Sequence, residues 1–343
     1  MKVARLYSFG DIRIEDIPVP PVGPGDALIK THACGICSGD VMPWYIERKA
    51  PLVLGHEPTG EIVETGKGVT YFKQGDKVFT HHHAPCFTCR FCRRGDYVQC
   101  PTWKGSHLVP GGISEYILIP SINLENDTIV LSENVTYEDG TLIEPAACVA
   151  KGIKRARIRS DDTVLIIGLG IMGILNLLFA REYGAGRVIC ADRVKFRLDK
   201  ALEYGADYTI DVSERPLNEG LKDITGGEMA ELVIVGPNSA EAMSEGLQCV
   251  RPGGQALFFT PAKPGEKLTI DPNYLYFNDI NIITSYSCGP DDTADAFELI
   301  EKGVVSAERL VTHRFPIEET AEAFALTAKA ENSLKSLIVF DRS

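Results

Sequence analysis

The pattern of hydrophobic and polar positions changes once along the chain. Before about residue 150, short apolar or alternating runs are separated by Gly, Pro and Asp, a pattern that predicts short strands joined by turns. The strands expected from it lie at residues 27–31, 60–65, 77–80 and 113–119. Closely spaced strands of this kind are typical of a barrel-like β domain.

From about Asp161 the pattern becomes a regular alternation of strands and helices. An apolar run at residues 164–167 is followed by a Gly-rich turn, a helical pattern at 171–183 and a strand at 187–191. Such an alternation predicts a parallel, doubly wound sheet. The later elements expected are strands at 208–210, 232–235, 256–260, 280–285 and 336–340, and helices at 239–249, 293–302 and 317–329.

The first Gly-rich turn reads Gly168-Leu169-Gly170-Ile171-Met172-Gly173. Between a strand and a helix, the first glycine of this pattern allows a tight turn and the second lets the backbone approach a pyrophosphate. The third lets the helix pack closely on the sheet. The amides at the helix N-terminus can then bind the diphosphate. We predict a dinucleotide site here; the alternative is that the glycines serve packing alone.

Asp192 ends the next expected strand. A carboxylate at this point can accept hydrogen bonds from the adenosine ribose hydroxyls and repels a 2′-phosphate, so we expect NAD as the cofactor. Arg193 keeps NADP as the alternative, because an arginine here can accommodate that phosphate; it can equally stack on the adenine or lie in solvent. Arg197 is also included in the predicted cofactor site.

A group of four cysteines indicates a metal site: Cys86, Cys89, Cys92 and Cys100. Four thiolates at this spacing can surround a Zn²⁺ ion tetrahedrally and leave no position for water, so the zinc would be structural. Arg90, Arg93 and Arg94 lie between them and can offset the negative charge of such a site. The alternative is a set of reduced thiols without metal. In a cytosolic chain, clustered cysteines indicate metal ligands more often than disulfides.

The composition narrows the class of protein. The chain has 343 residues, of which 44% are hydrophobic and 24% charged, values that exclude a disordered chain, a coiled coil and a collagen-like fibre. The net charge of −12 argues against nucleic acid and anionic membranes as partners. The apolar runs are shorter than the ~20 residues of a membrane span. The N-terminus has no signal-peptide pattern, and we therefore expect a cytoplasmic protein.

A further group of candidate ligands is dispersed along the chain: Cys37, His56, Glu57 and Glu144. Each has an ordinary alternative as a turn residue or a loop acid. Together, Cys, His and Glu can supply the three protein ligands of an open zinc site, which keeps one position for water or substrate.

The residues from Gly55 to Gly66, Gly-His-Glu-Pro-Thr-Gly-Glu-Ile-Val-Glu-Thr-Gly, resemble the zinc-ligand signature of the zinc-containing medium-chain alcohol dehydrogenases. The four-cysteine group and the glycine turn follow in that family's order, and Glu144-Pro145 looks like the third ligand of its sorbitol and threonine dehydrogenase branch. The resemblance implies an α/β fold. In it, a GroES-like β-barrel catalytic domain would cover residues 1–150, with 291–343 returning to it, and a Rossmann domain would cover 151–290.

The resemblance also implies a set of roles. A catalytic zinc would lie on Cys37, His56 and Glu144, with Glu57 beside it as an alternate ligand, so that each chain would hold two zinc ions. Asp40 matches the acid that orients the zinc-bound imidazole. The zinc would lower the pKa of a bound substrate hydroxyl, and a hydride would pass to the nicotinamide.

The chain departs from the family pattern in two places. The family reads Cys-Gly-Ser/Thr-Asp-x-His after the zinc cysteine, whereas this chain reads Cys-Ser-Gly-Asp-Val-Met from Cys37 to Met42. Ser38 can take over the displaced hydroxyl, and the proton relay histidine is absent. The second departure is the run from His81 to His83. It is either a polar turn, or His81 and His83 point as alternate strand residues into the active site and bind substrate or carry the proton.

The expected activity is oxidation of a secondary alcohol of a polyol, sugar alcohol or cyclitol. The alternatives within the class are an L-threonine or simple secondary-alcohol dehydrogenase. Outside it, the chain could be a non-catalytic or zinc-free NADP-binding relative. The resemblance implies a homo-oligomer, either a tetramer or a dimer.

Overall fold

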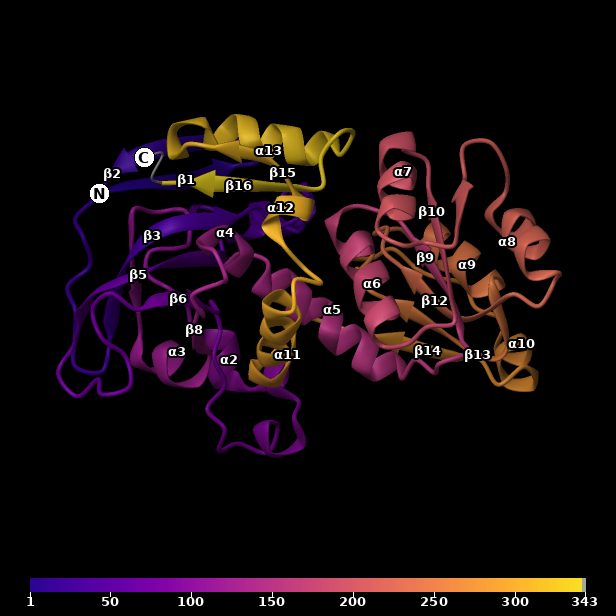
Figure 1. The fold of residues 1–343 in the computed structure, drawn as a ribbon, viewed down its shortest axis with the longest axis horizontal. Coiled ribbons are helices and arrows are strands. Elements are labelled where there is room, and N and C mark those ends of the chain that lie inside the picture. The colour runs from indigo at the N-terminus through magenta and orange to yellow at the C-terminus, as the bar shows by residue number, and fades with distance from the viewer. Residues whose placement is uncertain (341–343) are drawn as a thin grey trace. The chain divides into compact units, whose positions relative to one another are not determined.

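The computed structural model describes residues 1–340, which form two compact units (Figure 1). The first unit contains residues 1–147 and the chain from Cys288 onward, and the second contains Cys148–Ser287. Within the described residues, no helix is both long and apolar enough to cross a lipid bilayer.

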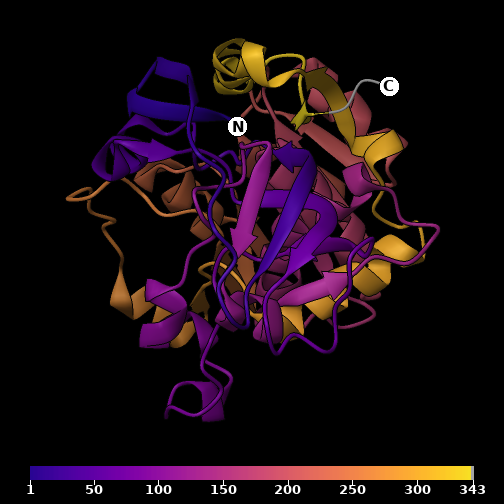
Figure 2. The same ribbon diagram turned by 90° about the vertical axis from the view of Figure 1, so that its left-hand side faces the viewer.

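The first unit is built mainly of strands (Figure 2). They are β1 (Lys2–Ser8), β2 (Asp11–Asp16), β3 (Ala27–Gly35), β4 (Leu52–Val53), β5 (Glu57–Thr65), β6 (Lys77–Thr80), β7 (Tyr116–Ile119), β8 (Thr128–Val130), β15 (Val311–Phe315) and β16 (Lys335–Val339). The larger sheet has the order β15-β16-β3-β5-β6-β8, with β7 also paired to β3, and the smaller has the order β2-β1-β4. Both β3 and β5 are buried over most of their length, so this sheet forms the centre of the unit.

The register of the larger sheet gathers several chain segments at one edge. The antiparallel pairing of β3 with β5 sets Gly35 opposite Glu57, and the pairing of β16 with β3 sets Leu337 opposite Gly35. Because β6 is antiparallel to β5, with Phe79 opposite Thr59, the residues that follow β6 lie at the edge where β5 begins. Segments distant in the sequence therefore meet at this edge.

The helices of the first unit are α1 (Pro43–Ile46), α2 (Pro101–Gly105), α3 (Ser121–Asn126), α4 (Tyr137–Gly140), α11 (Pro290–Glu301), α12 (Ala307–Leu310) and α13 (Thr320–Lys329), with 3₁₀ helices at Glu47–Lys49, Cys92–Arg94, Tyr97–Gln99 and Ile317–Glu319. Most of these helices are short, and the longer ones are α11 and α13. The helix α5 (Ile143–Ala156) begins in this unit and continues into the second. Local sequence explains their starts: Thr136 and Asp139 form a capping box before α4, and Pro290 is the first residue of α11.

The second unit is the predicted parallel, doubly wound sheet. Its strands are β9 (Thr163–Ile167), β10 (Arg187–Asp192), β11 (Tyr208–Asp211), β12 (Ala230–Val235), β13 (Val250–Phe258) and β14 (Asn281–Thr284). They lie in the order β11-β10-β9-β12-β13-β14, and all five pairings are parallel. The strand order reverses at β9, so the carboxyl end of β9 is the point where such folds bind ligands. The connecting helices are α6 (Ile171–Glu182), α7 (Lys195–Glu203), α8 (Leu217–Thr225), α9 (Ala240–Gln248) and α10 (Pro272–Phe277).

Most element boundaries differ little from those expected. The predicted strand at 113–119 begins three residues later, as β7, because Ile113 and Ser114 bond to other segments: the N–H of Ile113 donates to the carbonyl oxygen of Leu54, and Ser114 forms a bridge with Val3. The predicted helix at 317–329 is divided into a 3₁₀ helix and α13. The strand expected at 256–260 begins earlier, at Val250.

A glycine substitution tests the packing of the turn between β9 and α6. A Cβ atom at Gly173 would lie 2.0 Å from the carbonyl oxygen of Gly168, so the helix and the turn would have to separate. We expect Gly173→Ala to lower the free energy of unfolding by about 1–3 kcal/mol in urea titrations. Gly105→Ala is the control, because a Cβ there meets nothing within 4 Å. Equal stability of the two variants would contradict the close approach.

Candidate metal centres and dinucleotide site

The four cysteines predicted to bind zinc lie together in one lobe. Every pair of their sulfur atoms lies within 4.8 Å. The separations are 3.5 Å for Cys89–Cys92, 3.6 Å for Cys86–Cys100 and 4.0 Å for Cys86–Cys92. A tetrahedral zinc with Zn–S bonds of ~2.3 Å requires sulfur atoms about 3.8 Å apart. The donor set therefore fits a closed zinc site.

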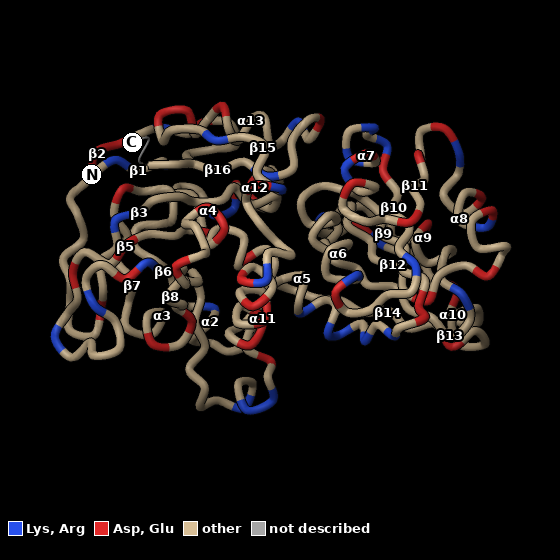
Figure 3. The backbone as a smooth tube through the Cα atoms, in the orientation of Figure 1, with Lys and Arg blue, Asp and Glu red and all other residues tan. Residues whose placement is uncertain are grey.

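The environment of the lobe favours thiolate ligands. Hydrogen bonds from Thr88 lower the pKa of Cys86 to about 5, which keeps this thiol ionised and ready to bind a cation. Figure 3 shows basic positions in the same lobe, where the sequence carries Arg90, Arg93 and Arg94. Their charge can offset the negative charge of four thiolates around one Zn²⁺.

A second donor set lies at the sheet edge defined above. Cys37 follows β3 by two residues, and His56 and Glu57 stand at the start of β5, so the pairing of Gly35 with Glu57 brings them together. The donor atoms of Cys37, His56 and Glu57 lie within 4.8 Å of one another. Gly55 makes this possible, since its φ of +90° suits glycine and a Cβ would meet Ile113 at 2.6 Å.

Asp40 fixes the orientation of His56, as predicted for an acid behind a zinc-bound imidazole. Its Oδ2 atom lies 3.1 Å from Nδ1 of His56, and Asp40 is buried. A carboxylate accepts a hydrogen bond from Nδ1–H, so the lone pair of Nε2 remains available to a metal. Ser38 lies in the tight turn between Cys37 and Asp40, where the N–H of Asp40 donates to the carbonyl oxygen of Cys37 at 3.1 Å.

Burial and charge set the protonation of this donor set. Burial lowers the pKa of His56, but the nearby Asp40 and Cys37 outweigh it and raise the pKa well above its usual value. Burial raises the pKa of the Cys37 thiol. A metal ion that binds here competes with protons for the imidazole nitrogen and the sulfur, so its affinity rises with pH.

Glu57 has a partner that the sequence analysis missed. Lys335, at the start of β16, forms a fully buried ion pair with Oε2 of Glu57 and donates to the carbonyl oxygen of Ile36 at 3.0 Å. The other carboxylate oxygen, Oε1, is buried and has no hydrogen-bond partner among residues 1–340. An orphaned carboxylate oxygen beside Cys37 and His56 is the arrangement that a metal ion would complete. The only signal in the sequence is a lysine directly before the apolar strand expected at 336–340.

Glu144 does not lie in this mutual set. It is the second residue of α5, and its carboxylate falls instead within 4.8 Å of donors from His81 and His82. It is still close enough to Glu57 for its charge to add to the effect of burial, which raises the pKa of Glu57. The carboxylate that groups with Cys37 and His56 is thus Glu57, and Glu144 belongs to an adjoining group.

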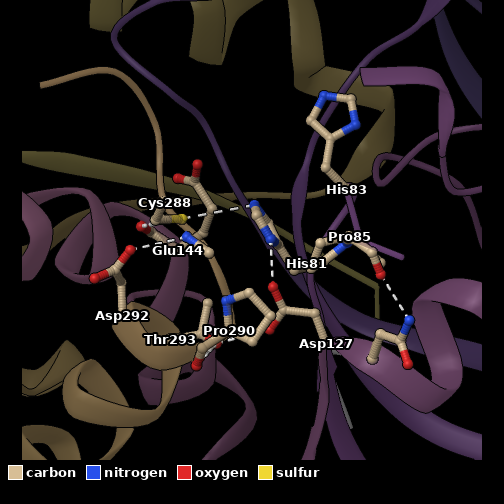
Figure 4. Close-up of polar contacts among 12 residues, drawn as sticks. His81, His83, Pro85, Asp127, Glu144, Cys288, Pro290, Asp292 and Thr293 are labelled. Atoms are coloured by element: carbon tan, nitrogen blue, oxygen red, sulfur yellow. Dashed lines mark hydrogen bonds and ion pairs between the residues drawn. The ribbon is translucent and has the colours of Figure 1, made fainter. Parts of the chain in front are cut away.

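The histidine run does not alternate as a strand would. The strand β6 ends at Thr80, so His81, His82 and His83 follow an irregular path. His81 is buried beside Glu144 (Figure 4), whereas His83 turns away and its Nδ1 atom lies 2.7 Å from the carbonyl oxygen of Ser106. The expectation that His83 points into the active site is therefore wrong. His82 takes that place, with its ring centroid 4.8 Å from that of His56.

The glycine turn of the second unit has the geometry of an anion site. Gly168 has a φ of +85°, and Gly173 packs on its carbonyl oxygen. Gly170 precedes α6 without a side-chain cap, so Ile171 and Met172 present the first amides of the helix to a ligand. The turn lies at the carboxyl end of β9, where the strand order of the sheet reverses.

Asp192 and Arg197 lie against this turn. The carboxylate of Asp192 accepts hydrogen bonds from the N–H groups of Leu169 at 2.6 Å and Val194 at 2.9 Å. Arg197 Nη1 lies 3.7 Å from the same carboxylate, and its Nε atom is buried without a hydrogen-bond partner among the described residues. Arg193 is exposed. The partly buried cation near the turn is therefore Arg197, whose charge suits an anionic ligand.

Comparisons with known proteins identify the family of the chain. The model of the alcohol dehydrogenase GroES-like domain matches residues 23–126, and that of the zinc-binding dehydrogenases matches residues 170–302. Sorbitol dehydrogenase from Ovis aries is 32% identical over 98% of this chain and 96% of its own length.

Two solved structures have the same fold. A zinc-binding dehydrogenase from Sinorhizobium meliloti 1021 bound to NADP has a TM-score of 0.89 and 27% identity, and each chain covers 98% of the other. A short chain alcohol dehydrogenase from E. coli CFT073 complexed with NADH has a TM-score of 0.89 and 26% identity over 99% of both chains.

The chain belongs to the zinc-containing medium-chain alcohol dehydrogenase family, in the branch that contains the sorbitol dehydrogenases. The predicted family and fold class are thereby confirmed: a GroES-like domain is joined to a parallel-sheet dinucleotide-binding domain of the Rossmann type. The class of the chain is therefore that of the zinc-binding dehydrogenases.

The four-cysteine lobe can be tested by metal analysis. We expect Cys89→Ala to reduce the zinc content by about one ion per chain and to lower the melting temperature by several degrees, because three thiolates hold the ion less tightly. Cys249→Ala is the control, since this buried thiol lies in the core of the second unit. An unchanged zinc content in Cys89→Ala would rule out the lobe as a zinc site.

Proposed function

We propose that this chain is a zinc-dependent dehydrogenase that transfers a hydride from a secondary alcohol of a polyol, sugar alcohol or cyclitol to NAD. The observation that carries the proposal is the donor set of Cys37, His56 and Glu57, in which Glu57 has a buried carboxylate oxygen without a hydrogen-bond partner among the described residues. Membership in the alcohol dehydrogenase family supplies the reaction class.

A zinc ion bound to this set would supply Lewis acidity and lower the pKa of a substrate hydroxyl. Cys37 and His56 would hold the ion through sulfur and Nε2. Glu57 would be the carboxylate ligand within this donor set, and Glu144, the third ligand that the family resemblance implies, would reach the ion from the adjoining group. Asp40 keeps the proton on Nδ1 of His56, and Lys335 binds Oε2 of Glu57, which leaves Oε1 without a hydrogen-bond partner among the described residues. We assign to Ser38 the hydroxyl that contacts the substrate.

We propose NAD as the cofactor, held by the turn from Gly168 to Gly173. A carboxylate at Asp192, at the end of β10, favours the two ribose hydroxyls over a 2′-phosphate. NADP is the second candidate, favoured by the NADP-bound zinc-binding dehydrogenase of similar fold and by the cationic Arg197 at the same turn.

We propose a polyol or a related compound as substrate because a sorbitol dehydrogenase is 32% identical to this chain. L-Threonine and simple secondary alcohols are the alternatives. The test is a panel of polyols, cyclitols, sugars and L-threonine with NAD or NADP, followed by the absorbance of the reduced cofactor. No turnover of any of these by zinc-loaded protein would favour a non-catalytic, nucleotide-binding role.

We propose that the chain forms a homo-oligomer, a tetramer or a dimer, in the cytoplasm. Support comes from α10, where Tyr276 and Phe277 are 76% and 75% exposed. β14, which follows α10 in the chain, is an edge strand of its sheet. Exposed aromatic side chains and an unpaired strand edge are the features that a second copy can cover.

Substitution of the proposed zinc ligands tests the catalytic assignment. We expect Cys37→Ser and His56→Ala each to lower kcat at least about a thousandfold, since the lost Lewis acidity is worth several kcal/mol in the transition state. Binding of NAD, measured by fluorescence titration, should change less than about twofold. Cys249→Ala is the control. A kcat equal to that of the wild type in either variant would remove the assignment.

Cofactor preference can be tested at Asp192. We expect Asp192→Asn to lower the ratio of kcat/KM for NAD to that for NADP at least about tenfold, equivalent to ~1.4 kcal/mol, because the charge that repels a 2′-phosphate is lost. Arg193→Ala should change this ratio less than about twofold, since Arg193 is exposed. An unchanged ratio in Asp192→Asn would contradict the role given to its carboxylate.

A further inference from the structure

Two cations stand close to the proposed catalytic set, on the chain segment that follows Cys37. They are Arg48 and Lys49, in the 3₁₀ helix that directly follows α1. Both side chains are exposed, and neither forms an ion pair within residues 1–340. Glu47 is the one acid of residues 43–50, so this segment has a net positive charge.

A series of turns ties this segment to the proposed zinc ligand. The N–H of Asp40 donates to the carbonyl oxygen of Cys37 at 3.1 Å, and the N–H of Met42 donates to that of Gly39 at 3.1 Å. The helix α1 begins directly after Met42, and Ile46 at its end is buried. The two cations that follow are therefore held at a defined place relative to the catalytic set.

Two aromatic side chains of α1 contact the cations. The Nζ atom of Lys49 lies 3.9 Å from the centroid of the Tyr45 ring. The Cζ atom of Arg48 lies 5.6 Å from the ring centroid of Trp44 and 5.7 Å from that of Tyr45. An aromatic ring attracts a cation through its face and is not a conventional acceptor for its N–H groups. These N–H groups therefore remain available for charge-assisted hydrogen bonds to an anion.

The ring of Tyr45 also adjoins the turn that carries Cys37. A Cβ atom at Gly39 would lie 3.5 Å from Sγ of Cys37 and 3.8 Å from Cε1 of Tyr45. The sulfur and the ring thus lie against the same glycine, and Lys49 lies on that ring. The cations are therefore neighbours of the proposed zinc position.

The charge of Lys49 acts on this region. Burial raises the pKa of Asp40, but the nearby His56 and Lys49 outweigh it and lower this pKa. Burial lowers the pKa of His107, and Lys49 lowers it further. The chain as a whole has a net charge of −12, which repels anions at long range. A local positive charge beside the catalytic set would favour an anion at this place over the rest of the surface.

We propose that Arg48 and Lys49 bind an anionic group of the substrate, so that this dehydrogenase acts on a polyol chain that carries a phosphate or a carboxylate at one end. This inference rests on the proposed function, because it names the substrate class of the same site. The anion would contact the guanidinium and ammonium groups while the reacting hydroxyl lies at the zinc position. The competing explanation is that both cations are solvated and only stabilise α1 through their aromatic partners.

The test compares matched substrates that differ at one end of a six-carbon chain: D-sorbitol, D-sorbitol 6-phosphate and D-gluconate, with the corresponding mannitol and galactitol series. The zinc-loaded, full-length protein is assayed with NAD and with NADP. For the configuration that is oxidised most efficiently, we expect kcat/KM of an anionic member to exceed that of its neutral counterpart about tenfold, since two exposed cations contribute. The phosphate and carboxylate members show which anion is preferred.

Variants of the two cations test their part in this preference. Arg48→Gln and Lys49→Gln should each raise KM for the anionic substrate about threefold, and the pair about tenfold, with little change in kcat. For the neutral substrate, kcat/KM should change less than about twofold. The preference of the wild type should also fall as the salt concentration rises, because both cations are exposed.

Lys73→Gln is the matched control and should keep the preference of the wild type. This exposed lysine lies in the loop from the end of β5 to the start of β6, whereas His56 directly precedes the start of β5. Circular dichroism and zinc content identify any variant that fails to fold.

Two results would overturn the inference and leave the dehydrogenase function intact. One is oxidation of neutral polyols, cyclitols or L-threonine at least as efficiently as of the anionic compounds. The other is an unchanged anionic preference in the Arg48→Gln/Lys49→Gln pair. Turnover of neither neutral nor anionic alcohols would instead contradict the proposed function itself, and the inference with it.

Discussion

The antiparallel pairing of β3 with β5 is the constraint on which the chemistry of the first unit depends. It sets Gly35 opposite Glu57, so Cys37 and His56, 19 positions apart in the sequence, lie together at one edge of the sheet. Two further strand pairings bring more residues to the same edge. The pairing of β16 with β3 places Lys335 there, and the pairing of β6 with β5 places the run from His81 to His83 there. Since side chains alternate along a strand, a register shift of one residue would turn Glu57 to the other face and dissolve the donor set.

This edge concentrates groups that are expensive to bury. Glu57 and Lys335 are each about 1% exposed, and Asp40, Asp127 and Glu144 are also buried. Removal of one partner from a buried ion pair typically lowers the stability of a protein by about 3–5 kcal/mol. Glu57 and Lys335 therefore each depend on the other to remain buried and charged. Two of the carboxylates serve histidines through Nδ1 and leave the Nε2 atoms directed at further donors. The sheet therefore supplies rigidity, and the carboxylates supply orientation.

The sequence predicted the features that depend on short spacing. The glycine turn and the four-cysteine lobe each lie within about 15 residues, and the alternation of strands and helices after Asp161 is a local pattern. The role of Lys335 could not be predicted, because its partner Glu57 is 278 positions away and neither local sequence indicates the pairing. The expected orientation of His83 was wrong for a different reason. β6 ends at Thr80, so the side chains after it no longer alternate, and His82 lies beside His56 instead. A run of three polar residues does not show where a strand ends.

The local sequence around Glu144 does not predict which donor groups its carboxylate meets. Its position before Pro145 matches a family ligand, and a helix start explains both residues, because proline is favoured in the first turn. Which donors the carboxylate meets depends instead on how α5 packs against the end of β6 and the residues before α11. In this fold those segments bring His81 and His82 to it, while its charge still acts on Glu57. A carboxylate between two donor sets can bind to either or to both. Its partners follow from the packing of three segments, not from its own motif.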